Sequence, residues 1–125
     1  MRKKANPKPT IDDICVINGS PYAETHEIIP GNSVARICQD EGLIIRLSGE
    51  MHRSSPTGIH HNDEFKRVVQ MVAEQQWIDR ENATTEDFRQ RFHCKSFIGE
   101  FYEEYKDSNW WDKLMEYSIG DKPIK

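Results

Sequence analysis

The run ETHEIIPG, residues 24–31, decides how the first half of this chain folds. Its β-branched and apolar residues predict a short strand as far as Ile29, and the final Pro-Gly pair predicts the turn that closes it. The strand also carries His26, flanked by the acids Glu24 and Glu27. Because imidazole and carboxylate groups are metal ligands, the run indicates a metal site as well as a strand.

A second strand is predicted over residues 43–47, which have the highest β-branched content in the chain. Between the two strands, residues 33–41 place apolar side chains at helical spacing, and Gly42 is expected to end that short helix. After the second strand, a Ser-Ser-Pro-Thr-Gly loop leads to residues 59–62, which read Ile-His-His-Asn. The pattern of strand, short helix, strand and loop therefore precedes the first long helix.

The clearest helix is predicted over residues 63–79, with Asn62 or Asp63 as its N-cap. Its apolar stripe consists of Phe65, Val68, Val69, Val72, Ala73 and Trp77. Thr84 and Asp87 form a capping-box pattern that begins another helix. The aromatic segment 97–117 is expected to form two short helices, with a break at residues 107–109.

These elements predict an α+β protein with one small domain and two terminal additions. Residues 1–10 are expected to be a flexible basic arm, because the first eight carry four cations and no acid. Residues 11–98 form the expected domain. Residues 99–125 form an acidic, aromatic helical extension that packs on or beside it.

The amino-acid composition argues against a membrane protein and against DNA binding through overall charge. Hydrophobic residues make up 36% of the chain and charged residues 30%, and no apolar run is long enough for a membrane helix. The N-terminus lacks the apolar segment of a signal peptide, so a cytoplasmic location is expected. The three cysteines form no Cys-x-x-Cys pair and predict reduced thiols. A net charge of −4 means that DNA binding would depend on local cations.

Three histidines are expected to converge. His26 lies on the first strand, His52 just after the second, and His60 just before the long helix. Three neutral imidazoles suit a divalent transition-metal ion and leave positions open for water and phosphate. The competing interpretation is that these histidines are solvated surface residues, and spacing alone leaves both open.

Several segments, in this order, carry a resemblance to a known family: Glu24–Gly31, Gln39–Leu43, Leu47–Arg53, Gly58–His60 and Arg91–Phe97. They resemble a small family of phage-borne, HNH-like proteins of the ββα-metal kind. The family pattern places a His-His-Ile segment after an acid, then a Gly-Leu segment, a strand leading into Cys-x-x-Cys-His, Gly-Val-His, and an amphipathic helix. The resemblance covers roughly two thirds of the chain and leaves the part after Ile98 outside it.

The resemblance implies one metal site and the loss of another. Four zinc-knuckle cysteines of the family fall on Cys15, Asn18, Ser48 and Met51, and only Cys15 keeps a thiol. A structural zinc needs four strong ligands, so none is expected here. The catalytic layer is better preserved, with the three ligand positions of the family held by the same three histidines.

The catalytic base is where the sequence departs from the family. Glu27 stands where the family has a base histidine, and a carboxylate is ordinarily a weaker base than an imidazole. Glu27 could instead ligate the metal, and His61 is a candidate substitute base. The proposed positioning cations for the phosphate backbone are Arg53, Arg36 and Lys66.

The resemblance thus predicts an HNH-like endonuclease that hydrolyses DNA phosphodiester bonds, with full or reduced activity. One divalent ion (Mg²⁺, Mn²⁺, Ni²⁺ or Zn²⁺) would be its cofactor, and DNA would bind weakly and with salt dependence. The alternative is a catalytically degenerate scaffold of phage origin that binds a host or phage protein as an inhibitor or adaptor. Its working surface would be the aromatic segment between Glu100 and Tyr117.

Overall fold

Two short strands, β1 (Glu24–Glu27) and β2 (Ile44–Leu47), pair antiparallel and form one small sheet. The computed structural model describes residues 11, 13–54, 58–60 and 62–115. In the sheet, Glu24 lies opposite Leu47 and His26 lies opposite Ile45. Directly opposed side chains point to the same face, so Glu24 and His26 share the face of two fully buried residues of β2.

Helix α1 (Asn32–Glu41) connects the two strands and confirms the short helix predicted there. It ends at Gly42, whose backbone is left-handed with φ 74°, a conformation that glycine adopts without steric cost. The next amide, that of Leu43, donates to the Cys38 carbonyl at 2.8 Å and directs the chain into β2. β2 is followed by η1 (Glu50–Ser54), a single π-helical turn.

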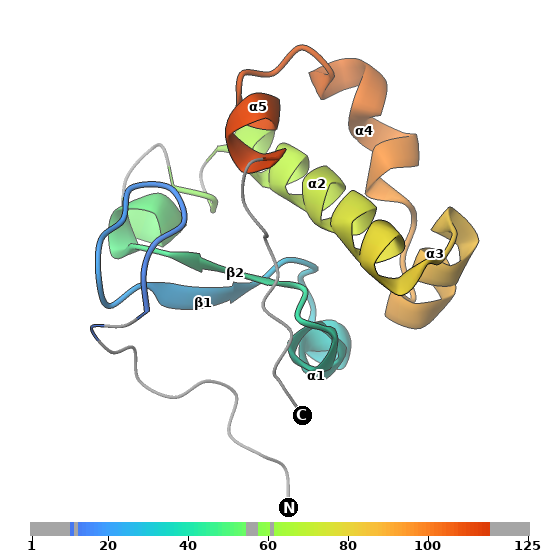
Figure 1. Ribbon diagram of the computed structural model, residues 1–125, viewed down its shortest axis with the longest axis horizontal. Helices are drawn as coiled ribbons and strands as arrows, with labels where there is room; N and C mark the ends of the chain where they lie inside the picture. Colours follow the sequence, from blue (N-terminus) through green and yellow to red (C-terminus); the bar gives the residue numbers. More distant parts are fainter. Residues whose placement is uncertain (1–10, 12, 55–57, 61, 116–125) are drawn as a thin grey trace, which may run out of the picture.

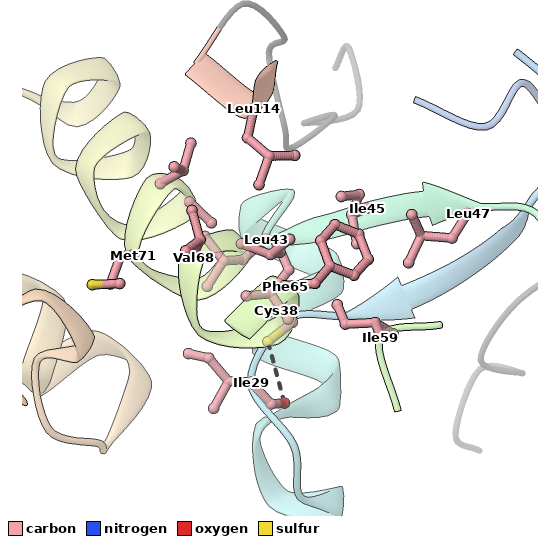
Figure 2. Packing of buried hydrophobic residues seen from close by; sticks show 14 of the residues in the cluster. Ile29, Cys38, Leu43, Ile45, Leu47, Ile59, Phe65, Val68, Met71 and Leu114 are labelled. Carbon is pink, nitrogen blue, oxygen red and sulfur yellow. Dashed lines mark hydrogen bonds between the residues drawn. The ribbon is translucent and has the colours of Figure 1, made fainter. Parts of the chain in front are cut away.

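Helix α2 (Asp63–Glu81) is the longest element of the described chain and confirms the strongest helix prediction. The side chain of Asn62 caps it by accepting a hydrogen bond from the Phe65 amide at 3.1 Å. Its apolar stripe is buried between the sheet and the C-terminal helices, where Trp77 packs against Phe88 and Phe92. Figure 2 shows Phe65 and Val68 of α2 facing Leu43 and Ile45, which come from β2 and the residue before it.

Three shorter helices complete the fold: α3 (Thr85–Phe92), α4 (Phe97–Tyr105) and α5 (Trp110–Met115). The capping box of α3 is present, because Thr84 and Asp87 exchange side chain-to-backbone hydrogen bonds. The predicted break at residues 107–109 separates α4 from α5. Figure 1 shows α2 between the sheet on one side and α4 on the other.

The aromatic C-terminal helices pack back onto α2. The Trp110 ring lies 4.5 Å from the Phe65 ring, centroid to centroid, and Leu114 is fully buried. Figure 2 shows Leu114 reaching towards the layer that contains Leu43 and Phe65. These contacts make the described part of the extension continuous with the hydrophobic core.

The described helices include none that combines the length and apolarity needed to cross a membrane. The described residues form an α+β fold with one two-stranded sheet.

Candidate metal centre

His26 is held by β1, and the strand also decides which way its side chain points. Side chains alternate along a strand, so Glu24 and His26 lie on the same face, and the intervening Thr25 on the other. That face is the core-facing one, opposite Leu47 and Ile45. His26 is accordingly only partly exposed.

His52 is held by the π-helical turn η1. Its amide donates to the Ser48 carbonyl at 2.8 Å, and the Ser48 hydroxyl accepts a hydrogen bond from the Met51 amide at 3.3 Å. π-Helical turns are rare and frequently occur at functional sites, because the extra residue in the turn redirects a side chain. Here the turn directs His52 towards β1.

His60 is brought to the same place by backbone pairing. The Ile59 amide donates to the Met51 carbonyl at 2.7 Å, and the His60 amide donates to the His52 carbonyl at 3.2 Å. Ile59 is 1% exposed and anchors this segment in the core. His60 itself is exposed and forms the solvent-facing side of the group.

The three imidazoles gather into one cluster. Their ring nitrogens offer one donor atom each, and these three atoms lie within 4.8 Å of one another. The ring centroids are 5.1 Å apart for His26 and His52, 5.0 Å for His26 and His60, and 4.7 Å for His52 and His60. The sequence prediction that these residues converge is therefore matched by their positions.

The spacing of the donor atoms fits a metal ion. His26 Nδ1 lies 3.2 Å from His52 Nε2. Two nitrogens that each lie about 2.0–2.1 Å from a tetrahedral zinc ion are about 3.3–3.4 Å apart. This pair stands at almost this separation, and the His60 donor atom lies within 4.8 Å of both. The three residues therefore fit a transition-metal ion if the His60 side chain moves closer to the pair.

The electrostatics keep His26 in the form that binds metals. The pKa of His26 is lowered from 6.5 to about 3, mainly by burial and in addition by the positive charge of the neighbouring His52, His60 and Lys66. Metal ligation requires the neutral imidazole, whose ring carries a free lone pair. The site therefore presents a deprotonated His26 nitrogen throughout the neutral pH range.

A pocket opens beside the cluster, with a volume of about 270 Å³. Its lining consists of Thr25, His26, Glu27, Ile29, Pro30, Gly31, Ala35, His52 and His60. The wall opposite the histidines comes from the turn after β1 and the first turn of α1. A small polar group can therefore approach the histidine nitrogens from this side.

Glu27 also lines this pocket, but it is not part of the donor group formed by the histidines. Its Oε2 accepts a hydrogen bond from the Gln39 side-chain amide at 3.4 Å. Strand alternation places its side chain on the other face of β1 from His26. The carboxylate is thus beside the candidate centre, with α1 as its neighbour.

The other predicted site residues are distributed unevenly. Lys66, in the first turn of α2, is close enough for its charge to lower the pKa of His26. Arg36 lies on the exposed side of α1, where it pairs with Asp40 at 3.6 Å. His61 and the Arg53 side chain lie outside the described residues.

Sequence reasoning assigned no role to Glu24, whose Oε1 lies 2.7 Å from His52 Nδ1. The sequence did contain a signal for a role of Glu24. It precedes His26 by two residues on a strand, so the two side chains point to the same face. What the sequence did not reveal was that η1 would bring His52 over this position.

The four positions that the resemblance aligned with zinc-knuckle cysteines lie on two turns that meet. Asn18 Nδ2 donates to the Ser48 hydroxyl at 3.2 Å, and the Val16 amide donates to the Arg46 carbonyl at 3.1 Å. Cys15 and Met51 are buried on the same two turns. A polar contact thus connects these two turns.

Comparison with known proteins adds no relative: no family model, no curated protein and no solved structure matches this chain. The case for function therefore depends on the geometry of the histidine cluster and its surroundings.

Proposed function

We propose that this protein binds one divalent transition-metal ion through His26, His52 and His60 and uses it to hydrolyse DNA phosphodiester bonds. The observation that carries the proposal is the convergence of three imidazole donors, from β1, from η1 and from the segment before α2, within 4.8 Å of one another. The order of strand, strand and helix around them agrees with the ββα-metal resemblance of the sequence. We therefore favour an HNH-like endonuclease.

The donor set also favours a class of ion. All three donors are imidazole nitrogens, which suit Zn²⁺, Ni²⁺ and related ions, whereas Mg²⁺ prefers oxygen ligands in an octahedral arrangement. Of the four ions considered from the sequence, we expect Zn²⁺ or Ni²⁺ to bind more tightly than Mg²⁺ or Mn²⁺.

When bound, the ion would supply Lewis-acid stabilisation of the charge that develops on the phosphate. Among the chain's own residues, Glu27 lines the pocket and is the candidate base for the attacking water. Its Oε2 also accepts the hydrogen bond from the Gln39 side-chain amide, so the carboxylate must share this oxygen between α1 and an attacking water. His61 remains the alternative base.

Lys66 is the best placed of the candidate cations for the phosphate backbone. Its Nζ lies 4.0 Å from the Asp63 carboxylate, and its charge acts on His26. Phosphate contacts orient a nucleic acid without reading its sequence. We expect Lys66→Ala to weaken DNA binding and to reduce the salt dependence of that binding, while the variant still binds the metal ion.

One observation favours the second candidate function, a protein-binding scaffold without catalysis. Glu27 replaces the base histidine of the family pattern and is engaged by Gln39. On this alternative, the aromatic C-terminal helices would contact the partner, and Tyr102 and Met115 are their most exposed apolar side chains. Most of the other aromatic residues there are at least partly buried.

Plasmid cleavage separates the two candidates. The protein is incubated with supercoiled DNA and Zn²⁺, Ni²⁺, Mn²⁺ or Mg²⁺, alongside His52→Ala. A matched control, His93→Asn, removes an imidazole that lies at the end of α3, outside the cluster. Nicking by the wild type and the control, but not by His52→Ala, supports the nuclease. No nicking with any of the ions would refute it and leave the binding scaffold.

A further inference from the structure

Glu24 makes a short polar contact with the histidine cluster. Its Oε1 lies 2.7 Å from His52 Nδ1, and the two side chains are 29% and 12% exposed. The contact joins β1 to η1 across 28 residues of sequence. It is therefore a tertiary contact, built by the fold, and not a local feature of either element.

The contact decides which nitrogen of His52 carries the hydrogen. An ionised carboxylate can only accept a hydrogen bond, so Nδ1 must be the protonated ring nitrogen. In neutral His52 the lone pair then lies on Nε2. This is the nitrogen that stands 3.2 Å from His26 Nδ1, on the side of the cluster where the donor atoms gather.

We propose that Glu24 is a positioning residue for the metal centre: it holds His52 in the Nδ1-protonated tautomer and aims Nε2 at the ion. The inference rests on the proposed function, because it needs the three histidines to be ligands. Carboxylates that hydrogen-bond the outer nitrogen of a ligating histidine fix the ring orientation and raise the basicity of the ligand. Glu24 and His26 share one face of β1. The strand therefore supplies one proposed ligand, His26, and also the residue that positions a second proposed ligand, His52.

Metal affinity is the first measurement. Zn²⁺ is titrated against a chromophoric chelator with the wild type, Glu24→Ala and Glu24→Gln. Loss of such a carboxylate typically weakens metal binding about 10–100-fold, and we expect this for Glu24→Ala. Glu24→Gln keeps a neutral hydrogen-bond acceptor, so its metal affinity should fall by less than that of Glu24→Ala. Glu103→Gln, which removes one charge from the exposed surface of α4, should bind like the wild type.

The second measurement needs no metal. In the metal-free wild type, ¹⁵N NMR of the imidazoles should show His52 protonated at Nδ1, and Glu24→Ala should shift it towards the other tautomer. A carboxylate that only stabilised the fold would lower the unfolding temperature without changing the tautomer. If Glu24→Ala does not fold, Glu24→Gln provides the same two comparisons.

The outcomes distinguish this inference from the proposed function. Weaker binding together with a changed tautomer supports the positioning role. Unchanged affinity, or an unchanged tautomer in the folded variant, overturns it while leaving the three-histidine site intact. A wild type that binds no metal would contradict the proposed function itself, and this inference with it.

Discussion

At the scale of single residues, His26 has the largest influence on the chemistry of the candidate metal centre. Its pKa of about 3 results from burial first and from neighbouring positive charge second. A histidine kept neutral at the end of a buried strand face is a ready metal ligand. The low pKa of His26 in the folded chain also affects stability, because in the unfolded chain the imidazole has its ordinary pKa of 6.5.

The pH dependence of stability follows from that difference. Below a pH of about 6.5 the unfolded chain takes up a proton at His26 that the folded chain does not bind. The free energy of unfolding of the metal-free protein should therefore fall as the pH is lowered from 6.5 towards 3, and this contribution is complete above 6.5. Urea unfolding of chelator-treated protein at several pH values measures it. His26→Asn should show a shallower decline, and an equal decline would contradict this origin.

Glu74 is the buried carboxylate that holds α4 in place. It is 0% exposed on α2, yet it accepts hydrogen bonds from the Ser96 hydroxyl at 2.6 Å and from the amides of Phe97 and Ile98 at 2.7 and 3.1 Å. Burial raises its pKa, whereas these three hydrogen bonds lower it. One side chain of α2 therefore satisfies two amides at the N-terminus of α4.

Removal of this carboxylate should be costly. We expect Glu74→Ala to lower the free energy of unfolding by about 2–4 kcal/mol, because a hydroxyl and two amides lose a charged partner in a buried site. Chemical denaturation monitored by circular dichroism measures the change. Glu103→Ala, at an exposed position of α4, should change stability by less than about 0.5 kcal/mol. Equal effects of the two substitutions would argue against a capping role for Glu74.

At the scale of elements, the turn at residues 15–18 meets the turn at residues 48–51, where the family pattern proposed from the sequence has a zinc knuckle. The Asn18–Ser48 hydrogen bond and the Val16–Arg46 backbone pair hold the two turns together. If the two turns retain the family arrangement, the thiol ligands can be restored by substitution.

This idea can be tested in a background that lacks the histidine site. We expect the triple substitution Asn18→Cys, Ser48→Cys and Met51→Cys, made in His52→Ala, to create a tetrahedral four-thiolate site with Cys15. Cobalt titration should then show thiolate-to-metal charge-transfer absorption, which His52→Ala alone lacks. A folded triple variant without that absorption would show that the turns have diverged from a knuckle.

The elements also show what the sequence could and could not reveal. Helical spacing identified α2 because nineteen residues repeat one local pattern, and capping residues located its start. The convergence of the histidines was foreseen from their placement around strands and a helix. The contacts of Glu24, Asn18 and Glu74 were not foreseen. Each joins residues at least 22 positions apart in the sequence, so it depends on packing rather than on a local pattern.

At the scale of the whole molecule, the C-terminal helices belong to the core that supports the site. Phe65, in the first turn of α2, contacts Trp110 of α5, and the same turn carries Lys66, whose charge helps to lower the pKa of His26. Leu114 is fully buried in the shared core. The described part of the extension therefore packs against α2, the helix that follows the segment carrying His60.

Truncation of Leu114 tests this coupling. Leu114→Ala should lower the free energy of unfolding by about 2–4 kcal/mol, the usual cost of a cavity at a buried leucine. Met115→Ala is the matched control, since Met115 is the next residue of α5 and is 52% exposed. Thermal and urea unfolding of both variants measure the difference. A Leu114→Ala protein as stable as the control would mean that α5 contributes little to the core.

The central claim, that three histidines form a metal centre, is tested most directly by the metal content of the purified protein. Elemental analysis after incubation with Zn²⁺ and removal of excess ion should find about one ion per chain in the wild type and in His93→Asn, and almost none in His52→Ala. A wild type without bound ion, or a His52→Ala variant with the same content as the wild type, would contradict the account.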